Sequence, residues 1–376
     1  MTQKEFVEMC ATAEYDDVVN AIDSGIDPDE PAIIKGIPAS AMFIAASAGN
    51  LKAVQALLHR RAKSADGYVA AVVSGNNRVL WYIANRVPEE IDDLDSNGTN
   101  ALLTATTMKK PDVVEDLLAT WEADPDAESA GGHTALTYAA MMAAHAKEEG
   151  STDTEDIFRI AALLVEYGAD CHEAMMIAVK AGLEDFAEAL VDAGGFFDVN
   201  FQDGEGRSLL MLSVMSGGGP LKLLLANGAK PDLPDKKGRT PLMVAAIDTE
   251  NGPAMIDILL RYGADINAHD NRGITPLMWS VVNTDNTPGV LLPALIPTGG
   301  VRAEGWKQWS AFLSLYTAAK RELQLDMIRR LLKEGADVNA TDRKGMNALM
   351  FAQMEGDDEV ADILTEAGAS INFDMK

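Results

Sequence analysis

A six-residue phrase, D-x-x-G-x-[T/S/N], returns along this chain, and an apolar helical pattern follows each copy. The copies begin at Asp95, Asp203, Asp235, Asp270 and Asp342, and a variant with serine in the first position begins at Ser129. Successive starts lie 34, 74, 32, 35 and 72 residues apart, so two steps look like doubled periods. A period near 33 residues predicts a stack of small helical units rather than one globular core.

The segment that begins at Asp235 indicates what each part of the repeat does. Asp and Gly in 235–238 have turn chemistry, and Thr-Pro at 240–241 suits a helix N-cap and first helical position. Two apolar stretches at helical spacing, 242–246 and 254–260, predict a pair of helices. Gly263 is typical of the left-handed residue that ends a helix. An extended run then leads into the next turn.

The order of elements in this unit resembles the ankyrin repeat: a turn, a helix, a loop, an antiparallel helix and a glycine that ends it. Thr240-Pro241-Leu242 and Thr275-Pro276-Leu277 match the T-P-L opening of that family, and Gly-Ala-Asp closes units at 168–170 and 335–337. The resemblance implies an all-α, ankyrin-type helical repeat solenoid over residues 1–376, with short hairpin-like turns. It implies about eleven units, with residues 1–34 and 345–376 as the N-terminal and C-terminal capping units. The unit starts are expected near residues 2, 35, 66, 97, 131, 172, 204, 238, 272, 304 and 345.

Several units depart from this pattern. In two of them the turn is nearly absent, because 61–64 and 170–171 run straight into a helical pattern. Enlarged loops are expected near 145–156 and 297–309; insertions of this kind often serve binding, although a tolerated solvated loop is an equal alternative. The family's histidine after T-P-L is replaced, for example by Met211, Met243 and Met278, which we expect to pack in the core.

The charge balance points to the kind of partner. With 31 Lys and Arg against 58 Asp and Glu, the net charge is −27. This argues against direct binding of nucleic acid or an anionic membrane, since phosphate contacts need cations. It favours a basic protein partner, although the charge could also serve solubility alone. Acidic residues expected at the turns, on a concave docking surface or simply on a solvated face, are Asp203, Glu205, Asp235, Asp270 and Asp342.

Apolar side chains offer a second set of candidate contacts. Methionine suits adaptable binding surfaces, and Met108, Met142 and Met215 fall near the ends of first helices. The alternative is that they contact the next unit. Trp306 and Trp309 share an enlarged loop with basic residues, a composition typical of binding hot spots, but they could instead cover the core of their own unit.

We find no motif that indicates catalysis. No nucleophile, phosphate loop or metal-ligand spacing has a credible context, so we predict no enzyme activity, catalytic residue, cofactor or metal site. Cys10 and Cys171 are far apart, which fits a reducing compartment. No signal peptide or membrane-length apolar run is visible, so we expect a cytoplasmic protein without membrane association.

These observations favour a monomeric, non-enzymatic protein–protein interaction module. Two narrower alternatives remain open. One is an inhibitor or immunity-type protein that blocks a toxic or nucleic-acid-acting enzyme, and the other is a secreted effector that uses the same surface. An enzyme built on the repeat would need a deep pocket of ionisable groups, which the sequence does not indicate.

Overall fold

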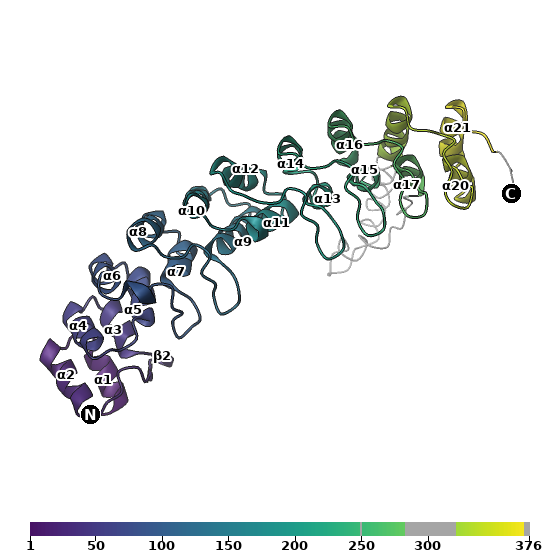
Figure 1. Cartoon of the computed structure of the whole chain (residues 1–376). Helices are drawn as coiled ribbons and strands as arrows, with labels where there is room; N and C mark the ends of the chain where they lie inside the picture. The colour runs from purple at the N-terminus through teal and green to yellow at the C-terminus, as the bar shows by residue number, and fades with distance from the viewer. Residues whose placement is uncertain (249, 283–320, 372–376) are drawn as a thin grey trace, which may run out of the picture. The chain divides into compact units, whose positions relative to one another are not determined.

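A computed structural model describes residues 1–248, 250–282 and 321–371. The chain divides into two compact units, residues 1–197 and 198–376, which we describe separately. Within each unit the helices come in antiparallel pairs, and the first helices of successive pairs lie side by side in one row, with the second helices in another (Figure 1). The mostly helical architecture confirms the all-α repeat solenoid predicted from the sequence.

The first unit has six helix pairs and one small hairpin, β1 (Ala32–Ile34) with β2 (Ile37–Ala39), in which Ala32 pairs with Ala39. A 3-10 turn, η1 (Pro88–Glu90), precedes the first full turn that matches the repeated phrase. The pairs are α1 (Gln3–Met9) with α2 (Tyr15–Asp23), α3 (Ala41–Ser47) with α4 (Leu51–His59), α5 (Ala65–Ser74) with α6 (Asn77–Ala84), α7 (Ala101–Thr107) with α8 (Pro111–Trp121), α9 (Ala135–Glu148) with α10 (Glu155–Glu166), and α11 (His172–Lys180) with α12 (Glu184–Asp192).

The second unit has four pairs among its described residues. The third of them joins α17 to a helix at 321–333, where the Gln324 side-chain amide donates to the Ser280 carbonyl at 3.0 Å. The pairs are α13 (Leu209–Met215) with α14 (Leu221–Ala226), α15 (Pro241–Ala245) with α16 (Gly252–Arg261), α17 (Pro276–Val282) with 321–333, and α20 (Ala348–Met354) with α21 (Asp358–Glu366).

The last residue of the repeated phrase is the N-cap of each first helix. The Asn100 side chain accepts from the Leu103 amide at 2.8 Å, and the Thr240 hydroxyl accepts from the Met243 amide at 3.4 Å. An N-cap oxygen satisfies a backbone donor that the helix itself leaves free, which explains why only Thr, Ser or Asn occurs here.

The glycine of the phrase has two roles. Gly238 has φ +78°, a conformation that L side chains rarely adopt, and an added Cβ would lie 2.7 Å from the Asn271 backbone nitrogen in the next turn. Consecutive turns are also joined through the backbone, since the Asn271 amide donates to the Lys237 carbonyl at 3.0 Å. Where no turn follows, as after Gly345, the space is open. We call these projecting turns fingers.

The core lies between the helices and is built from alanine, leucine and methionine. Ala45, Leu103 and Leu117 are at most 1% exposed, and small alanines let neighbouring helices approach closely. Met211, Met243 and Met278 are likewise at most 1% exposed, which confirms their core role.

The two long steps in the repeat have different causes. The 74-residue step contains two helix pairs, because α11 follows without a finger. In the 72-residue step, the fingers at both ends touch directly: the Arg343 amide donates to the Arg272 carbonyl at 2.9 Å. The described residues form ten helix pairs, and the start of the unit expected near 304 lies outside them.

The enlarged loops also need revision. Residues 145–148 belong to α9 and 155–156 to α10, so the first loop is 149–154, shorter than predicted. Alanine and glutamate at 146–149 favour continuation of α9 for another turn. The loop near 297–309 lies outside the described residues.

Candidate protein-interaction surface

The first aspartate of each phrase holds its own finger together. In the finger at Asp235, one carboxylate oxygen accepts from the Lys237 and Arg239 amides, both at 2.9 Å. The other oxygen pairs with the Arg239 guanidinium at 2.7 Å, and the Asp235 side chain is only 3% exposed. The sequence suggested Asp235 as a partner contact, whereas its geometry gives it a structural role.

Most of the other candidate carboxylates are placed in the same way. Asp203 pairs with Arg207, and Asp270 pairs with Arg272. Burial raises the pKa of Asp203, but the Arg207 guanidinium and backbone donors outweigh it and hold the pKa below its ordinary value. Asp342 accepts from two amides of its own finger. Of the five candidates, only Glu205 is exposed.

A second side chain, at the base of each finger, joins one repeat to the next. Asn267 accepts from the Asp337 amide at 2.8 Å, and Asp92 accepts from the Asp124 amide at 3.1 Å. Burial raises the pKa of Asp92, with further increases from the charges of Asp124 and Asp93. In the second unit, three acceptors end an Asp-x-Asn sequence and so carried a signal for this bond, whose role sequence reasoning missed: Asn200, Asn267 and Asn339. The acceptors are Asp29, Asp92 and Asp126 in the first unit and Asn200, Asp232, Asn267 and Asn339 in the second.

The two units differ in charge. Residues 1–197 contain 13 Lys and Arg against 34 Asp and Glu, a net charge of −21. Residues 198–376 contain 18 against 24, a net charge of −6. Within the first unit, the segments 87–108 and 111–146 contain no Lys or Arg at all. The lack of Lys and Arg in these segments is visible in the sequence. It places the candidate acidic region at α7–α11 rather than at the aspartates that begin the fingers.

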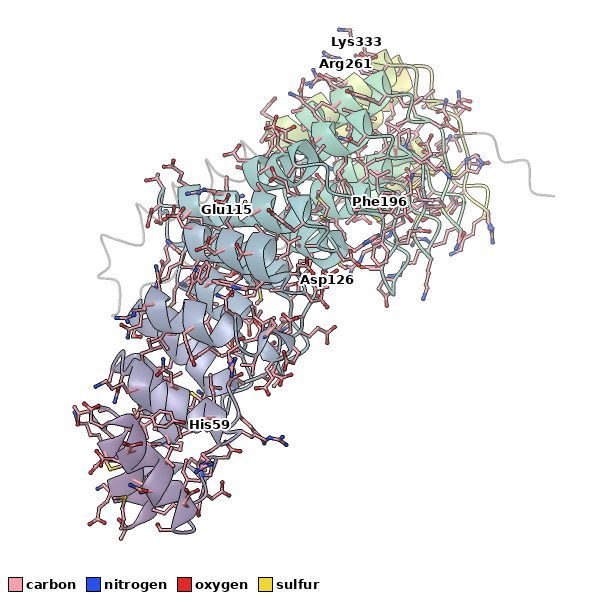
Figure 2. The ribbon with its side chains drawn as sticks, turned by 60° about the vertical axis from the view of Figure 1, so that its left-hand side comes forward. His59, Glu115, Asp126, Phe196, Arg261 and Lys333 are labelled. Carbon is pink, nitrogen blue, oxygen red and sulfur yellow. The ribbon has the colours of Figure 1, made fainter. Side chains whose placement is uncertain are left out.

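Five exposed carboxylates mark this region, and we call them the acidic surface: Asp93, Asp124, Glu128, Asp170 and Glu173. Its two fingers are joined by the bond from the Ala130 amide to the Gly98 carbonyl, at 2.9 Å. Glu173 lies close to the second finger and to α9, because the His133 ring of that finger is 3.8 Å away and the Thr137 hydroxyl of α9 donates to it at 3.3 Å. Figure 2 places Asp126, at the base of that finger, on the opposite side of the unit from Glu115 of α8.

Only histidines face these carboxylates in the described ion pairs. The His172 ring lies 2.7 Å from Asp170, and the His133 ring lies 3.8 Å from Glu173. The His172 amide, and then its ring, hold the pKa of Asp170 below its ordinary value despite some burial. Asp170 therefore stays charged at neutral pH, and no Lys or Arg pairs with the five carboxylates among the described ion pairs.

The apolar candidates are distributed unevenly. Met108, which ends α7, is 40% exposed, and Met215 is 54% exposed, whereas Met142 is half-buried in α9. Leu94, beside Asp93, is also 40% exposed and was not singled out from the sequence. Trp306 and Trp309 lie outside the described residues.

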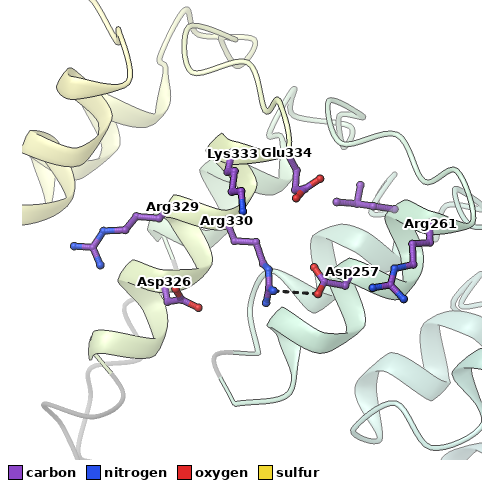
Figure 3. A pocket seen from close by; sticks show the side chains of 8 residues that line it. Asp257, Arg261, Asp326, Arg329, Arg330, Lys333 and Glu334 are labelled. Atoms are coloured by element: carbon purple, nitrogen blue, oxygen red, sulfur yellow. Dashed lines mark ion pairs between the residues drawn. The ribbon is translucent and has the colours of Figure 1, made fainter.

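The described residues show little that would support catalysis. Burial raises the pKa of the Cys10 thiol to about 12 and that of Cys171 to about 11, so both are weak nucleophiles at neutral pH. No cluster of three or more His, Cys, Asp or Glu in the described part could hold a metal ion. An open hollow of about 490 Å³ between α16 and 321–333 is lined by charged side chains, with Arg330 and Asp257 paired at 3.0 Å (Figure 3).

No helix among the described ranges combines the length and the apolar character that crossing a bilayer requires.

Comparison with known families identifies the repeat. Residues 218–292 and 307–375 match a family model described as ankyrin repeats, in three copies. The chain contains ankyrin repeats. The matched residues belong to the second unit, and the helix pairs and fingers of the first unit follow the same plan. Ankyrin repeats are generally protein–protein interaction modules and typically not enzymes, so a protein partner is indicated for this chain too.

Proposed function

We propose that this chain is a non-enzymatic docking module whose acidic surface binds a basic protein. The supporting observation is the group of five exposed carboxylates beside two joined fingers and at the start of α11, none of which pairs with a Lys or Arg among the described ion pairs. Opposite charge on a partner would raise the association rate, and salt would lower it.

Affinity also needs contacts that exclude water, because exposed ion pairs alone contribute little. Leu94 lies beside Asp93 in the first of these fingers, and Met108 ends the helix that follows it. Both are 40% exposed, and a partner could bury them while its cations meet the carboxylates. In this proposal the protein acts as a monomer in the cytoplasm, where its two buried thiols stay reduced.

The test is the association rate of the full chain with a labelled ten-residue lysine peptide, measured by stopped flow at low and high salt. Neutralising the surface with Asp93→Asn, Glu128→Gln and Glu173→Gln should lower the rate constant about tenfold at low salt. A matched control, Glu205→Gln, Glu250→Gln and Glu355→Gln, removes three exposed charges from the second unit and should change the rate less than about twofold. Equal losses in both variants would reject the acidic surface as the docking site.

The natural partner can then be sought by pull-down from native extract with the wild-type chain and the neutralised variant. A basic protein that the variant fails to retain, and that salt releases, fits the proposal. If that protein is an enzyme and a stoichiometric amount of the chain inhibits it, the role is that of an inhibitor. The charge of the first unit, −21, favours this narrower candidate, because the clefts of nucleic-acid-acting enzymes are built to bind polyanions.

A further inference from the structure

We propose that the fingers of the second unit form a separate docking site for an acidic segment of a partner protein. The site comprises Lys236, Lys237, Arg272, Arg343 and Lys344, and we call it the basic row. It is independent of the acidic surface, because it lies in the other unit and has the opposite charge.

Backbone hydrogen bonds align three consecutive fingers. The Asn271 amide donates to the Lys237 carbonyl at 3.0 Å, and the Arg343 amide donates to the Arg272 carbonyl at 2.9 Å. Each bond joins one finger tip to the next, so the cations of the basic row stand on adjacent, mutually fixed tips. The last two fingers are neighbours although 72 residues separate their starts, so the sequence spacing conceals this alignment.

Of the three finger carboxylates, only Asp270 pairs with a member of the row, Arg272. Asp235 is 3% exposed and paired with Arg239, which does not belong to the row, and Asp342 accepts from its own finger's amides. Lys237, Arg343 and Lys344 are exposed, and none of them has an ion pair within the described ranges.

Two members of the row are already oriented. The Arg272 guanidinium lies over the Trp279 ring, 5.0 Å from its centroid, and is also held by Asp270, yet its side chain is 65% exposed. The Lys236 ammonium donates to the Gly204 carbonyl of the preceding finger at 2.5 Å. Side chains held in place before binding lose less conformational entropy when a ligand arrives.

The chemistry of the row fits carboxylates presented by an extended peptide. Guanidinium groups bind carboxylates through two parallel hydrogen bonds, and cations on successive tips match acidic side chains spaced along a chain. Nucleic acid phosphates also suit guanidinium groups, so single-stranded DNA is the competing ligand that the test distinguishes. We assign the row to an acidic protein segment.

The test uses the full chain and a fluorescein-labelled ten-residue glutamate peptide, with binding followed by fluorescence anisotropy at low salt. The wild-type chain should bind the peptide, and salt should weaken the complex. A triple variant of the basic row should raise the Kd of the glutamate peptide at least about tenfold: Lys237→Glu, Arg343→Glu and Lys344→Glu. The matched control, Arg261→Glu, Arg329→Glu and Lys333→Glu, changes three exposed cations beside the hollow of Figure 3 and should raise Kd less than about twofold.

If the Glu variant loses its helical circular dichroism, the same positions changed to Gln should still raise Kd severalfold in a folded protein. The assignment is overturned if the wild-type chain does not bind the peptide or if the control loses as much affinity. Tighter binding of a labelled ten-nucleotide single-stranded DNA than of the peptide would also overturn it. The Lys237, Arg343 and Lys344 variant should bind the lysine peptide as the wild-type chain does. A negative result with the glutamate peptide would therefore reject the basic row without rejecting the acidic surface.

Discussion

The two units share one finger backbone but differ in the charge around it: carboxylates flank the fingers at Asp95 and Ser129, whereas cations occupy the fingers at Asp235, Asp270 and Asp342. Asp95 and Asp235 make the same bonds to their own turns, yet the first finger has no cation and the second has Lys236, Lys237 and Arg239. Positions one, four and six of the phrase build the turn, the close approach and the helix cap. Positions two and three face outward in every copy, whereas position five is partly or fully buried, as Arg239 and Ile274 are. The charge at positions two and three can therefore change from finger to finger without altering the fold.

The largest effect should come from a structural carboxylate. Asp235→Ala leaves two amides and the Arg239 guanidinium without their acceptor, so it should lower the local free energy of unfolding by about 3 kcal/mol. Asp93→Ala, on the exposed acidic surface, should change it by less than about 0.5 kcal/mol. Native-state hydrogen exchange of α7 and α15 measures both values. Similar losses at the two sites would contradict the division between structural and outward positions.

The next largest effect on the free energy of unfolding should come from the close approach of stacked fingers. Gly273→Ala places a Cβ 2.9 Å from the Arg343 backbone nitrogen, whereas Gly345→Ala meets nothing within 4 Å. Both carry the strain of positive φ, about 1 kcal/mol, and only Gly273→Ala should cost about 1–2 kcal/mol more. In the first unit Gly98 and Gly132 form the same contrast, since only Gly98 would contact a following finger. Thermal unfolding of the four variants checks whether both units share this backbone.

A smaller effect on stability should distinguish aspartate from asparagine as the acceptor of the hydrogen bond between repeats. Burial raises the folded-state pKa of Asp92 above its ordinary value of 3.8, so the charged form is disfavoured in the folded protein. The stability that protonated Asp92 provides is complete below pH 3.8 and is lost as pH rises through the folded-state pKa. Asp92→Asn keeps the acceptor, as Asn200 and Asn267 do, and should stabilise the protein by about 0.5 kcal/mol at pH 7.

Urea unfolding across pH 3.5–7 measures this difference between Asp92→Asn and the wild-type chain. Asp232, where burial also raises the pKa, offers a second site with the same expectation. A gain that appears only at acid pH would have the wrong sign for this explanation.

The smallest effect concerns salt. Screening relieves self-repulsion more in the unit that carries −21 than in the unit that carries −6. Raising NaCl from about 0.05 M to 0.5 M should therefore increase amide protection in α7–α10 by a few tenths of a kcal/mol more than in α13–α16. Hydrogen exchange at both salt concentrations compares the units in one sample, and a larger gain in the second unit would contradict the charge comparison.

The sequence predicted the repeat well because its signals are local. Turn glycines such as Gly238, caps such as Thr240 and the helical period each follow from neighbouring residues. The position of the finger after Asp270 could not be predicted from the spacing alone. A 72-residue step does not show which fingers are neighbours, whereas the Arg343–Arg272 and Asp337–Asn267 hydrogen bonds place the finger at Asp342 next to the finger at Asp270.

The candidate site was less predictable. An aspartate in a turn can face solvent or its own backbone, and the identity of residue 235 alone does not distinguish these two orientations. Its arginine four residues later was a usable signal, because Arg207 and Arg239 both neutralise the aspartate of their own finger. The acidic surface could have been located by counting, since the absence of Lys and Arg from 111–146 is visible in the sequence.

The most direct test of the account is hydrogen exchange of the full chain with the lysine peptide and, separately, with the glutamate peptide. We predict that the lysine peptide protects 92–100 and 124–134, and that the glutamate peptide protects 235–240, 270–275 and 342–347. Protection of the same segments by both peptides, or the reverse assignment, would contradict the claim that the acidic surface and the basic row bind different partners.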